Sequence, residues 1–162
     1  MYVAAKRFLK RRGWTLLAGQ PPSGCDHLPV VEVKSTTREG IGSRGAYKPD
    51  LIAHGANVFL LIECKPAHDE GDAAKLREIL GDPGRVSTLF EELRQRYVFD
   101  RHEITADIEH FRRGLRGALA HSGEPIRQPD LLVITLENVD GSGKAFPPTF
   151  PDQLLDAALE LG

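Results

Sequence analysis

Three charged residues near the middle of the chain have types and spacing that could support chemistry on phosphates. Glu63 and Lys65 are separated by one residue at the end of an apolar run, VFLLIECK (58–65). In a β-strand, side chains two residues apart point to the same face, so a carboxylate and an ammonium would lie side by side. Asp50 follows Pro49, and twelve residues separate it from Glu63. A turn midway between them would fold Asp50 back towards Glu63 and Lys65.

Such a group of side chains suits a hard divalent cation. Carboxylate oxygens favour Mg²⁺ or Mn²⁺ over softer metals, so Asp50 and Glu63 are candidate metal ligands, together with the backbone carbonyl of Cys64. A bound ion would polarise a scissile phosphate and lower the pKa of its water. Lys65 could orient that water or stabilise the charge that develops on the phosphate. An ordinary surface ion pair is the alternative for Glu63 and Lys65, and the convergence of Asp50 favours the catalytic interpretation.

The elements that must position these residues form an α/β pattern. The apolar run at 58–65 predicts a strand buried on both faces, preceded by a short strand at 50–53 and a turn at 54–57. The other expected elements are an amphipathic helix over 2–12 ended by Gly13, a strand at 28–34 and helices near 72–80 and 86–93. A further helix, marked by apolar residues over 104–119, is expected to end near Gly123, followed by a strand at 130–137, a Gly/Pro-rich loop at 141–151 and a final helix to Leu161. This order predicts a single domain over 1–162 with a central mixed sheet flanked by helices, in which 130–137 returns parallel to 58–65.

The motif resembles the signature of a known superfamily. Lys48-Pro49-Asp50 followed by Ile62-Glu63-Cys64-Lys65 is similar to the signature of the PD-(D/E)XK, or restriction endonuclease-like, nucleases. The resemblance implies a restriction endonuclease-like core over about 2–137, followed by a C-terminal loop and helix at 141–161. It also implies a metal-dependent phosphodiesterase with Asp50 and Glu63 as metal ligands and Lys65 as the catalytic lysine. Many members add an acid from the first helix, but residues 1–14 contain none. The number of bound metal ions therefore stays open.

Basic residues outside the motif are candidates for contact with a phosphate backbone. The formal net charge is −2, so a nucleic-acid binder would need its cations clustered on one face. Arg38, Arg44 and Lys48, in or beside a glycine-rich segment, are the candidate nucleic-acid-binding residues. The basic face of the 2–12 helix is equally compatible with solvation and with phosphate contact. A second Glu-x-Lys, beginning at Glu32, is interpreted as a solvent-facing strand edge.

Together these features predict a metal-dependent nuclease that uses Mg²⁺ or Mn²⁺. The expected activity is that of a DNA endonuclease of the restriction, repair or defence type, with DNA favoured over RNA. A homodimer, or a fused or partner specificity subunit, would supply recognition. The alternative is a catalytically inactive nuclease-fold module that binds nucleic acid or protein. Two cysteines, Cys25 and Cys64, and the absence of a long apolar run predict a cytoplasmic protein without membrane association.

Overall fold

The computed structural model describes residues 1–22, 26–33 and 46–160, and its strands form one mixed sheet. In order across the sheet, the strands are β1 (Thr15–Gly19), β2 (Leu51–Gly55), β3 (Val58–Cys64), β4 (Leu115–His121), β5 (Leu132–Leu136) and β6 (Gly143–Phe146). The β3–β4 and β4–β5 pairs are parallel, and the other pairs are antiparallel. The predicted α/β class with a central mixed sheet is therefore confirmed.

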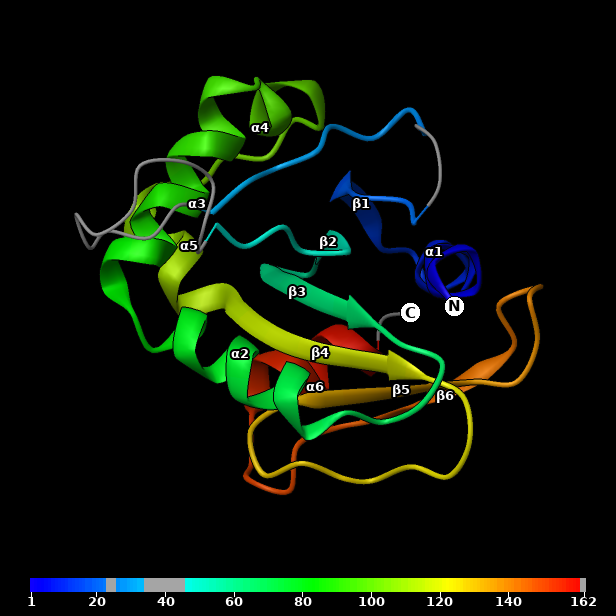
Figure 1. Cartoon of the computed structure of the whole chain (residues 1–162). Coiled ribbons are helices and arrows are strands. Elements are labelled where there is room, and N and C mark those ends of the chain that lie inside the picture. The colour runs from blue at the N-terminus through cyan, green and yellow to red at the C-terminus, as the bar shows by residue number, and fades with distance from the viewer. Residues whose placement is uncertain (23–25, 34–45, 161–162) are drawn as a thin grey trace.

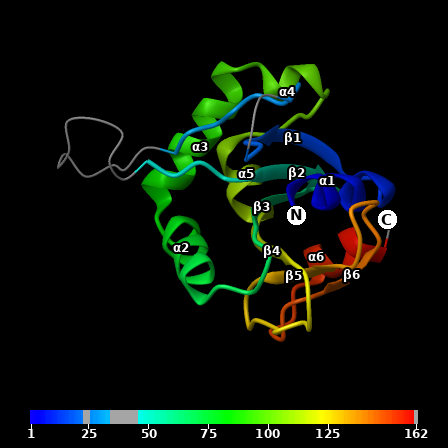
Figure 2. The same ribbon diagram turned by 45° about the vertical axis from the view of Figure 1, so that its right-hand side comes forward.

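Helices cover both faces of this sheet (Figure 1). They are α1 (Tyr2–Arg11), α2 (Glu70–Leu80), α3 (Pro83–Gln95), α4 (Val98–Arg101), α5 (Ile108–Gly114) and α6 (Gln153–Glu160). Buried residues of α1 and α6 pack on one face, whereas those of α2 to α5 pack on the other, an arrangement that the turned view of Figure 2 also shows. In the described part of the chain, no helix combines the length and the apolar character that crossing a membrane requires.

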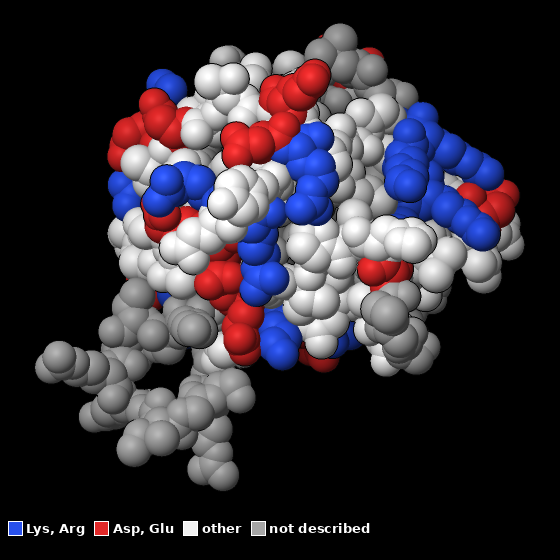
Figure 3. Space-filling view, turned by 90° about the horizontal axis from the view of Figure 1, so that it is seen from above, with Lys and Arg blue, Asp and Glu red and all other residues white. Residues whose placement is uncertain are grey.

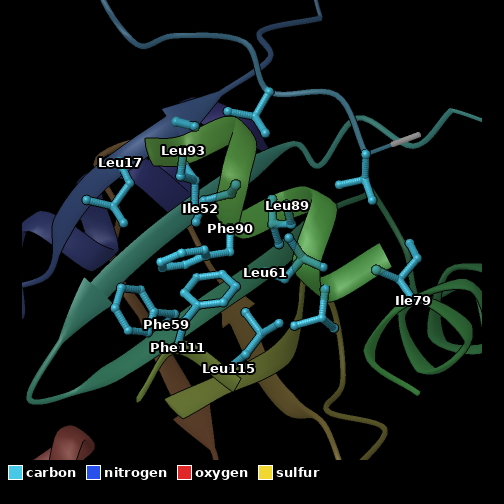
Figure 4. Close-up of a cluster of buried hydrophobic side chains, with 14 of the residues drawn as sticks. Leu17, Ile52, Phe59, Leu61, Ile79, Leu89, Phe90, Leu93, Phe111 and Leu115 are labelled. Atoms are coloured by element: carbon cyan, nitrogen blue, oxygen red, sulfur yellow. The ribbon is translucent and has the colours of Figure 1, made fainter. Parts of the chain in front are cut away.

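One hydrophobic cluster lies between the sheet and the helices α2 to α5 (Figure 4). Phe59 of β3 lies against Phe111 of α5 with ring centroids 4.9 Å apart, and Phe90 of α3 lies 5.5 Å from Phe111. Aromatic pairs of this kind contribute about 0.5–1.5 kcal/mol beyond the area that they bury. Phe59 and Leu61 point into this cluster, whereas Leu60 belongs to the cluster on the opposite face. The alternation of β3 therefore directs Glu63 to the face covered by α2 to α5.

The hairpin between β2 and β3 sets the register of the strands that carry the motif. Leu51 pairs with Ile62, and Gly55 pairs with Val58, so the chain reverses over two residues. These two residues, Ala56 and Asn57, have φ angles of 46° and 67°, the left-handed values that a type I′ turn requires. The turn predicted at 54–57 and the antiparallel pairing around it are confirmed.

The first strand is not where the sequence predicted it. Within 26–33 the only β-contact is an isolated bridge from Val33 to Tyr47, so the strand expected at 28–34 is wrong over its described part. The first strand is instead β1, which begins just after Gly13, a residue with a φ of 73°. Val31 and Val33 are buried in the hydrophobic cluster without joining the sheet. Their apolar character reflects burial against the sheet, which a period-two pattern does not distinguish from pairing.

The helix expected over 104–119 is also wrong in its second half, because α5 ends at Gly114 and β4 follows at once. At Gly114, an added Cβ would lie 2.3 Å from the carbonyl oxygen of Asn57, so the helix ends where the backbone packs closely against the hairpin turn. Hydrogen bonding of β4 to both β3 and β5 outweighs the local helical period. The parallel neighbour of β3 is therefore β4, and the strand predicted at 130–137 forms β5 next to it. The loop expected at 141–151 contains β6.

The left-handed conformation of Ala56 gives a direct test of the hairpin. Such a conformation costs a non-glycine residue about 1–2 kcal/mol, whereas the added freedom of glycine in the unfolded chain costs about 0.4–1 kcal/mol. We expect Ala56→Gly to raise the midpoint of thermal unfolding slightly and Ala56→Val to lower it clearly. The side chain is exposed, so packing changes do not interfere.

Ala157, an exposed residue within α6, provides the matched control. There the same Ala→Gly change should destabilise the protein by about 0.5–1 kcal/mol, because glycine is disfavoured inside a helix. Differential scanning calorimetry of the variants measures both effects. Equal destabilisation by Ala56→Gly and Ala157→Gly would contradict the turn conformation.

Candidate functional site

Asp50, Glu63 and Lys65 come together at the end of β3. Continuing the β2–β3 register by one residue beyond the Leu51–Ile62 pair places Asp50 opposite Glu63. The Asp50 Oδ2 atom accepts a hydrogen bond of 2.8 Å from the backbone N–H of Cys64. This contact fixes the Asp50 carboxylate next to the Glu-x-Lys segment. The convergence predicted from the spacing is therefore present in the structure.

Glu63 is buried, with only 3% of its surface exposed, and one of its oxygens is already held. The hydroxyl of Tyr47 donates a hydrogen bond to Glu63 Oε1. The ammonium of Lys75, from α2, lies 3.9 Å from the same oxygen and 4.4 Å from the centre of the Tyr47 ring. Among the residues that the structure describes, no hydrogen-bond partner for Glu63 Oε2 is found.

Lys65 forms an ion pair with Asp72, an acidic residue of α2. Its ammonium lies 3.7 Å from Asp72 Oδ2, and 43% of its side chain is exposed. Burial opposes the charge on Lys65, but the carboxylates of Asp72, Glu63 and Asp50 outweigh burial and raise its pKa. Lys65 therefore remains an ammonium ion at neutral pH and can donate hydrogen bonds to an anionic substrate.

The carboxylates carry an electrostatic cost in the absence of a cation. Burial is the main cause that raises the pKa of Asp50, and it also raises the pKa of Glu63. The negative charge of Asp72 raises the pKa values of both carboxyl groups further, whereas the positive charge of Lys75 lowers them. Among the described residues, the three carboxylates of Asp50, Glu63 and Asp72 thus lie near two ammonium groups, those of Lys65 and Lys75. Within this part of the chain, the excess of carboxylates favours a bound cation.

The donor set restricts how a metal ion could be held. Within 1–22, 26–33 and 46–160, no three side chains of His, Cys, Asp or Glu gather closely enough to bind one. A site at Asp50 and Glu63 would consist of two carboxylates, the backbone carbonyl of Cys64 and water or substrate oxygens. Mg²⁺ is typically bound in this way, with few protein ligands and several waters. The thiol of Cys64 does not take part, because it packs on the opposite face and burial raises its pKa.

A small pocket adjoins Lys65. Its charged and polar lining residues are Glu63, Lys65, His68, Asp69, Asp72 and His121, with Ala67, Leu119 and Ala120 beside them. From the sequence, the segment of His68, Asp69 and Asp72 is interpreted as a capped, solvated loop, with contact of His68 or Glu70 to metal-bound water as the alternative. The buried atoms His68 Nδ1, Asp72 Oδ2 and His121 Nε2 have no hydrogen-bond partner among the described residues. His121 was missed because its segment was predicted as helix. The helix near 72–80 begins earlier than predicted, with Asp69 as its N-cap, so Asp72 lies in its first turn and faces the site.

The expected nucleic-acid-binding residues are only partly described. Lys48 is exposed, and its ammonium lies 3.8 Å from Glu32, so its nearest charged partner is an acid of the protein itself. Arg38 and Arg44 lie outside the described residues. Glu32 is thereby paired with a lysine on an adjacent segment. Tyr47, next to Lys48, was not singled out, and no sequence signal connects its hydroxyl with Glu63.

The burial of Glu63 leads to a prediction about stability without metal. When the pKa of a carboxyl is higher in the folded than in the unfolded state, the folded state binds more protons between the two values, so the free energy of unfolding falls as the pH rises through that interval. At neutral pH the ionised Glu63 therefore lowers stability. Glu63→Gln removes the charge and keeps an oxygen acceptor for Tyr47. We expect it to raise the melting temperature at pH 7 in EDTA.

The gain should shrink as the pH is lowered towards the unfolded-state pKa, where Glu63 is protonated in the wild type as well. Thermal unfolding over a series of pH values measures this effect. Glu124→Gln, at an exposed position, controls for the change in net charge. A lower melting temperature of Glu63→Gln in EDTA at neutral pH would contradict the assignment of an electrostatic cost to this site.

Comparison with known proteins gives no relative from which a function could be transferred. No family model matches the chain, no curated protein matches it, and no solved structure matches it. The function of the site therefore follows from its own chemistry, namely the buried Glu63 and the half-buried Asp50, both with raised pKa values, and an adjoining lysine at the end of a central strand.

Proposed function

We propose that this protein is a metal-dependent nuclease that hydrolyses phosphodiester bonds. The observation that carries the proposal is the convergence of Asp50 and Glu63, two carboxylates with raised pKa values, beside the charged and partly exposed Lys65. Buried like charges are expensive unless a ligand compensates them, and perturbed titratable groups gather preferentially at functional sites. Mg²⁺ or Mn²⁺ is the proposed cofactor.

The residues of the site have separate roles in this proposal. When bound, the divalent ion supplies charge that polarises the scissile phosphate and activates water. Asp50 and Glu63 would hold the ion with their carboxylates, which are positioned by the Cys64 N–H and the Tyr47 hydroxyl. The ammonium of Lys65 donates hydrogen bonds to a phosphate oxygen and stabilises the charge that grows there. Asp72 orients Lys65, because its carboxylate lies 3.7 Å from the ammonium.

The order of elements supports a restriction endonuclease-like core. The chain runs α1, β1, β2, β3, then helices beginning with α2, then β4, which is the helix–strand–strand–strand–helix–strand order of the PD-(D/E)XK superfamily. The residues that resemble its signature lie at the start of β2 and the end of β3. The first helix contributes no acid, and Asp72 of α2 is the additional carboxylate near the site. DNA is the proposed substrate, since the restriction, repair and defence enzymes with this motif act on it.

A catalytically inactive module that binds nucleic acid or protein is the second candidate. It is favoured by one specific observation: Tyr47 and Lys75 already compensate one oxygen of Glu63, so part of the site is satisfied without metal. The two candidates differ in their response to divalent ions. A ligand that binds only the folded state raises the melting temperature, so Mn²⁺ should stabilise the nuclease and leave an inactive module unchanged.

The first prediction from this proposal concerns Lys65. We expect wild-type protein to cut supercoiled plasmid with Mg²⁺ or Mn²⁺ and not with EDTA, and Lys65→Ala to lower the rate by at least about 100-fold, because the growing charge loses its donor. Single-stranded RNA tested in parallel shows which nucleic acid is preferred. Lys144→Ala, an exposed lysine of β6, is the matched control. Full activity of Lys65→Ala would refute the role of this lysine.

The second prediction concerns Asp50. Asp50→Asn keeps an oxygen that can accept the hydrogen bond from Cys64 N–H, but it removes a negative charge from the metal site. We expect the affinity for Mn²⁺ to fall by at least about tenfold, as measured by isothermal titration calorimetry. Asp156→Asn, an exposed position of α6, should leave the affinity unchanged. Unaltered Mn²⁺ binding by Asp50→Asn would argue against a metal at this position.

A further inference from the structure

A basic groove runs along the first helix, apart from the residues of the site. Its walls are formed by the exposed side of α1 on one side and by the segment that follows β1 on the other. The lining residues of α1 include Val3, Lys6, Arg7 and Lys10, whose spacing places them on one helix face. Figure 3 shows Lys and Arg side chains gathered on the side of the molecule where α1 lies.

The groove is connected to the site through the end of β1. The backbone N–H of Gln20 donates a hydrogen bond of 2.9 Å to the carbonyl oxygen of Asp50. Pro21 and Pro22 follow Gln20 directly and form the wall opposite α1. Tyr2, which also lines the groove, lies close enough to Asp50 for this carboxylate to raise the pKa of the Tyr2 hydroxyl. A ligand in the groove would therefore lie near Asp50.

The charges in the groove are predominantly positive. Lys6 forms an ion pair with Asp26, the one acidic residue among those that line the groove. Arg7 donates a hydrogen bond to the carbonyl oxygen of Val139, which orients its guanidinium without neutralising it. Lys10 is exposed and makes no ion pair within the described part of the chain. Three cations against one carboxylate leave a surface that attracts anions.

We propose that this groove binds the phosphodiester backbone of a nucleic-acid strand that extends from the site at Asp50. The inference rests on the proposed nuclease function and adds the path of the substrate. Lys6 and Lys10 are four residues apart, about 6 Å along the helix axis, so they present successive charges to a linear polyanion. Val3, 48% exposed, and the two prolines offer apolar contact to sugars or bases. As a ligand, a single nucleic-acid strand fits into a concave groove between two walls better than a flat anionic surface does.

The test separates binding from cleavage. Fluorescence anisotropy with labelled single-stranded and double-stranded DNA in EDTA measures binding while cleavage is blocked. We expect Lys10→Glu to weaken binding at least tenfold, and Lys10→Gln to reduce the slope of log affinity against log salt concentration by about one. Arg113→Glu is the matched control, because it reverses an exposed charge on α5, at the opposite end of β3 from the site.

The outcomes distinguish this inference from the proposed function. If Lys10→Glu weakens DNA binding and Arg113→Glu does not, the result supports DNA binding in the groove. This holds even if Lys65→Ala shows that cleavage does not depend on the site. Equal effects of the two reversals would show a general charge effect and overturn the groove. Absence of binding by the wild type to either form of DNA would overturn it as well. If Lys10→Glu changes neither DNA binding nor metal-dependent cleavage, the proposed nuclease function stands and the proposed path of the strand along the groove is refuted.

Discussion

The register of the β2–β3 hairpin is the constraint on which the site depends. Because Ala56 and Asn57 reverse the chain in two left-handed residues, Leu51 pairs with Ile62 and Asp50 reaches Glu63. A shift by one residue would turn every side chain of the strand to the other face and would separate the two carboxylates. The buried alternation of Phe59 and Leu61 against Leu60 opposes such a shift. The packing of the core and the geometry of the site are therefore fixed by the same interaction.

The site combines a structural cost with a chemical use. Burial raises the pKa values of Asp50 and Glu63, so their ionised forms oppose folding at neutral pH. The protein limits this cost with partners that bind only part of each carboxylate, namely the Cys64 N–H and the Tyr47 hydroxyl. Neighbouring carboxylates at a strand end destabilise the folded protein when no cation is bound, and they favour the binding of a cation. Such a cost to stability is expected at functional sites.

The sequence predicted the parts of the structure that depend on local contacts. The hairpin, the buried strand ending in Glu63 and the helical stripe of α3 follow from turn residues and periodicity, and the convergence of Asp50 with Glu63 follows from them. β4 could not be predicted, because its helical period is overruled by pairing with strands distant in the sequence. The same limit hid Tyr47, Asp72 and His121, whose positions near Glu63 or Lys65 arise only from the tertiary fold. Their residue types alone carry no signal of proximity.

Helix α2 contacts both charged groups of the motif. Asp72 lies beside Lys65, and Lys75, almost one turn further along, lies beside Glu63, while Leu76 and Ile79 anchor the helix in the core. The acid and the base of the motif are thus connected to one rigid body. Any displacement of α2 changes the surroundings of Glu63 and Lys65 at the same time. Substitutions of Leu76 or Ile79 beneath this helix would therefore change the surroundings of both groups together.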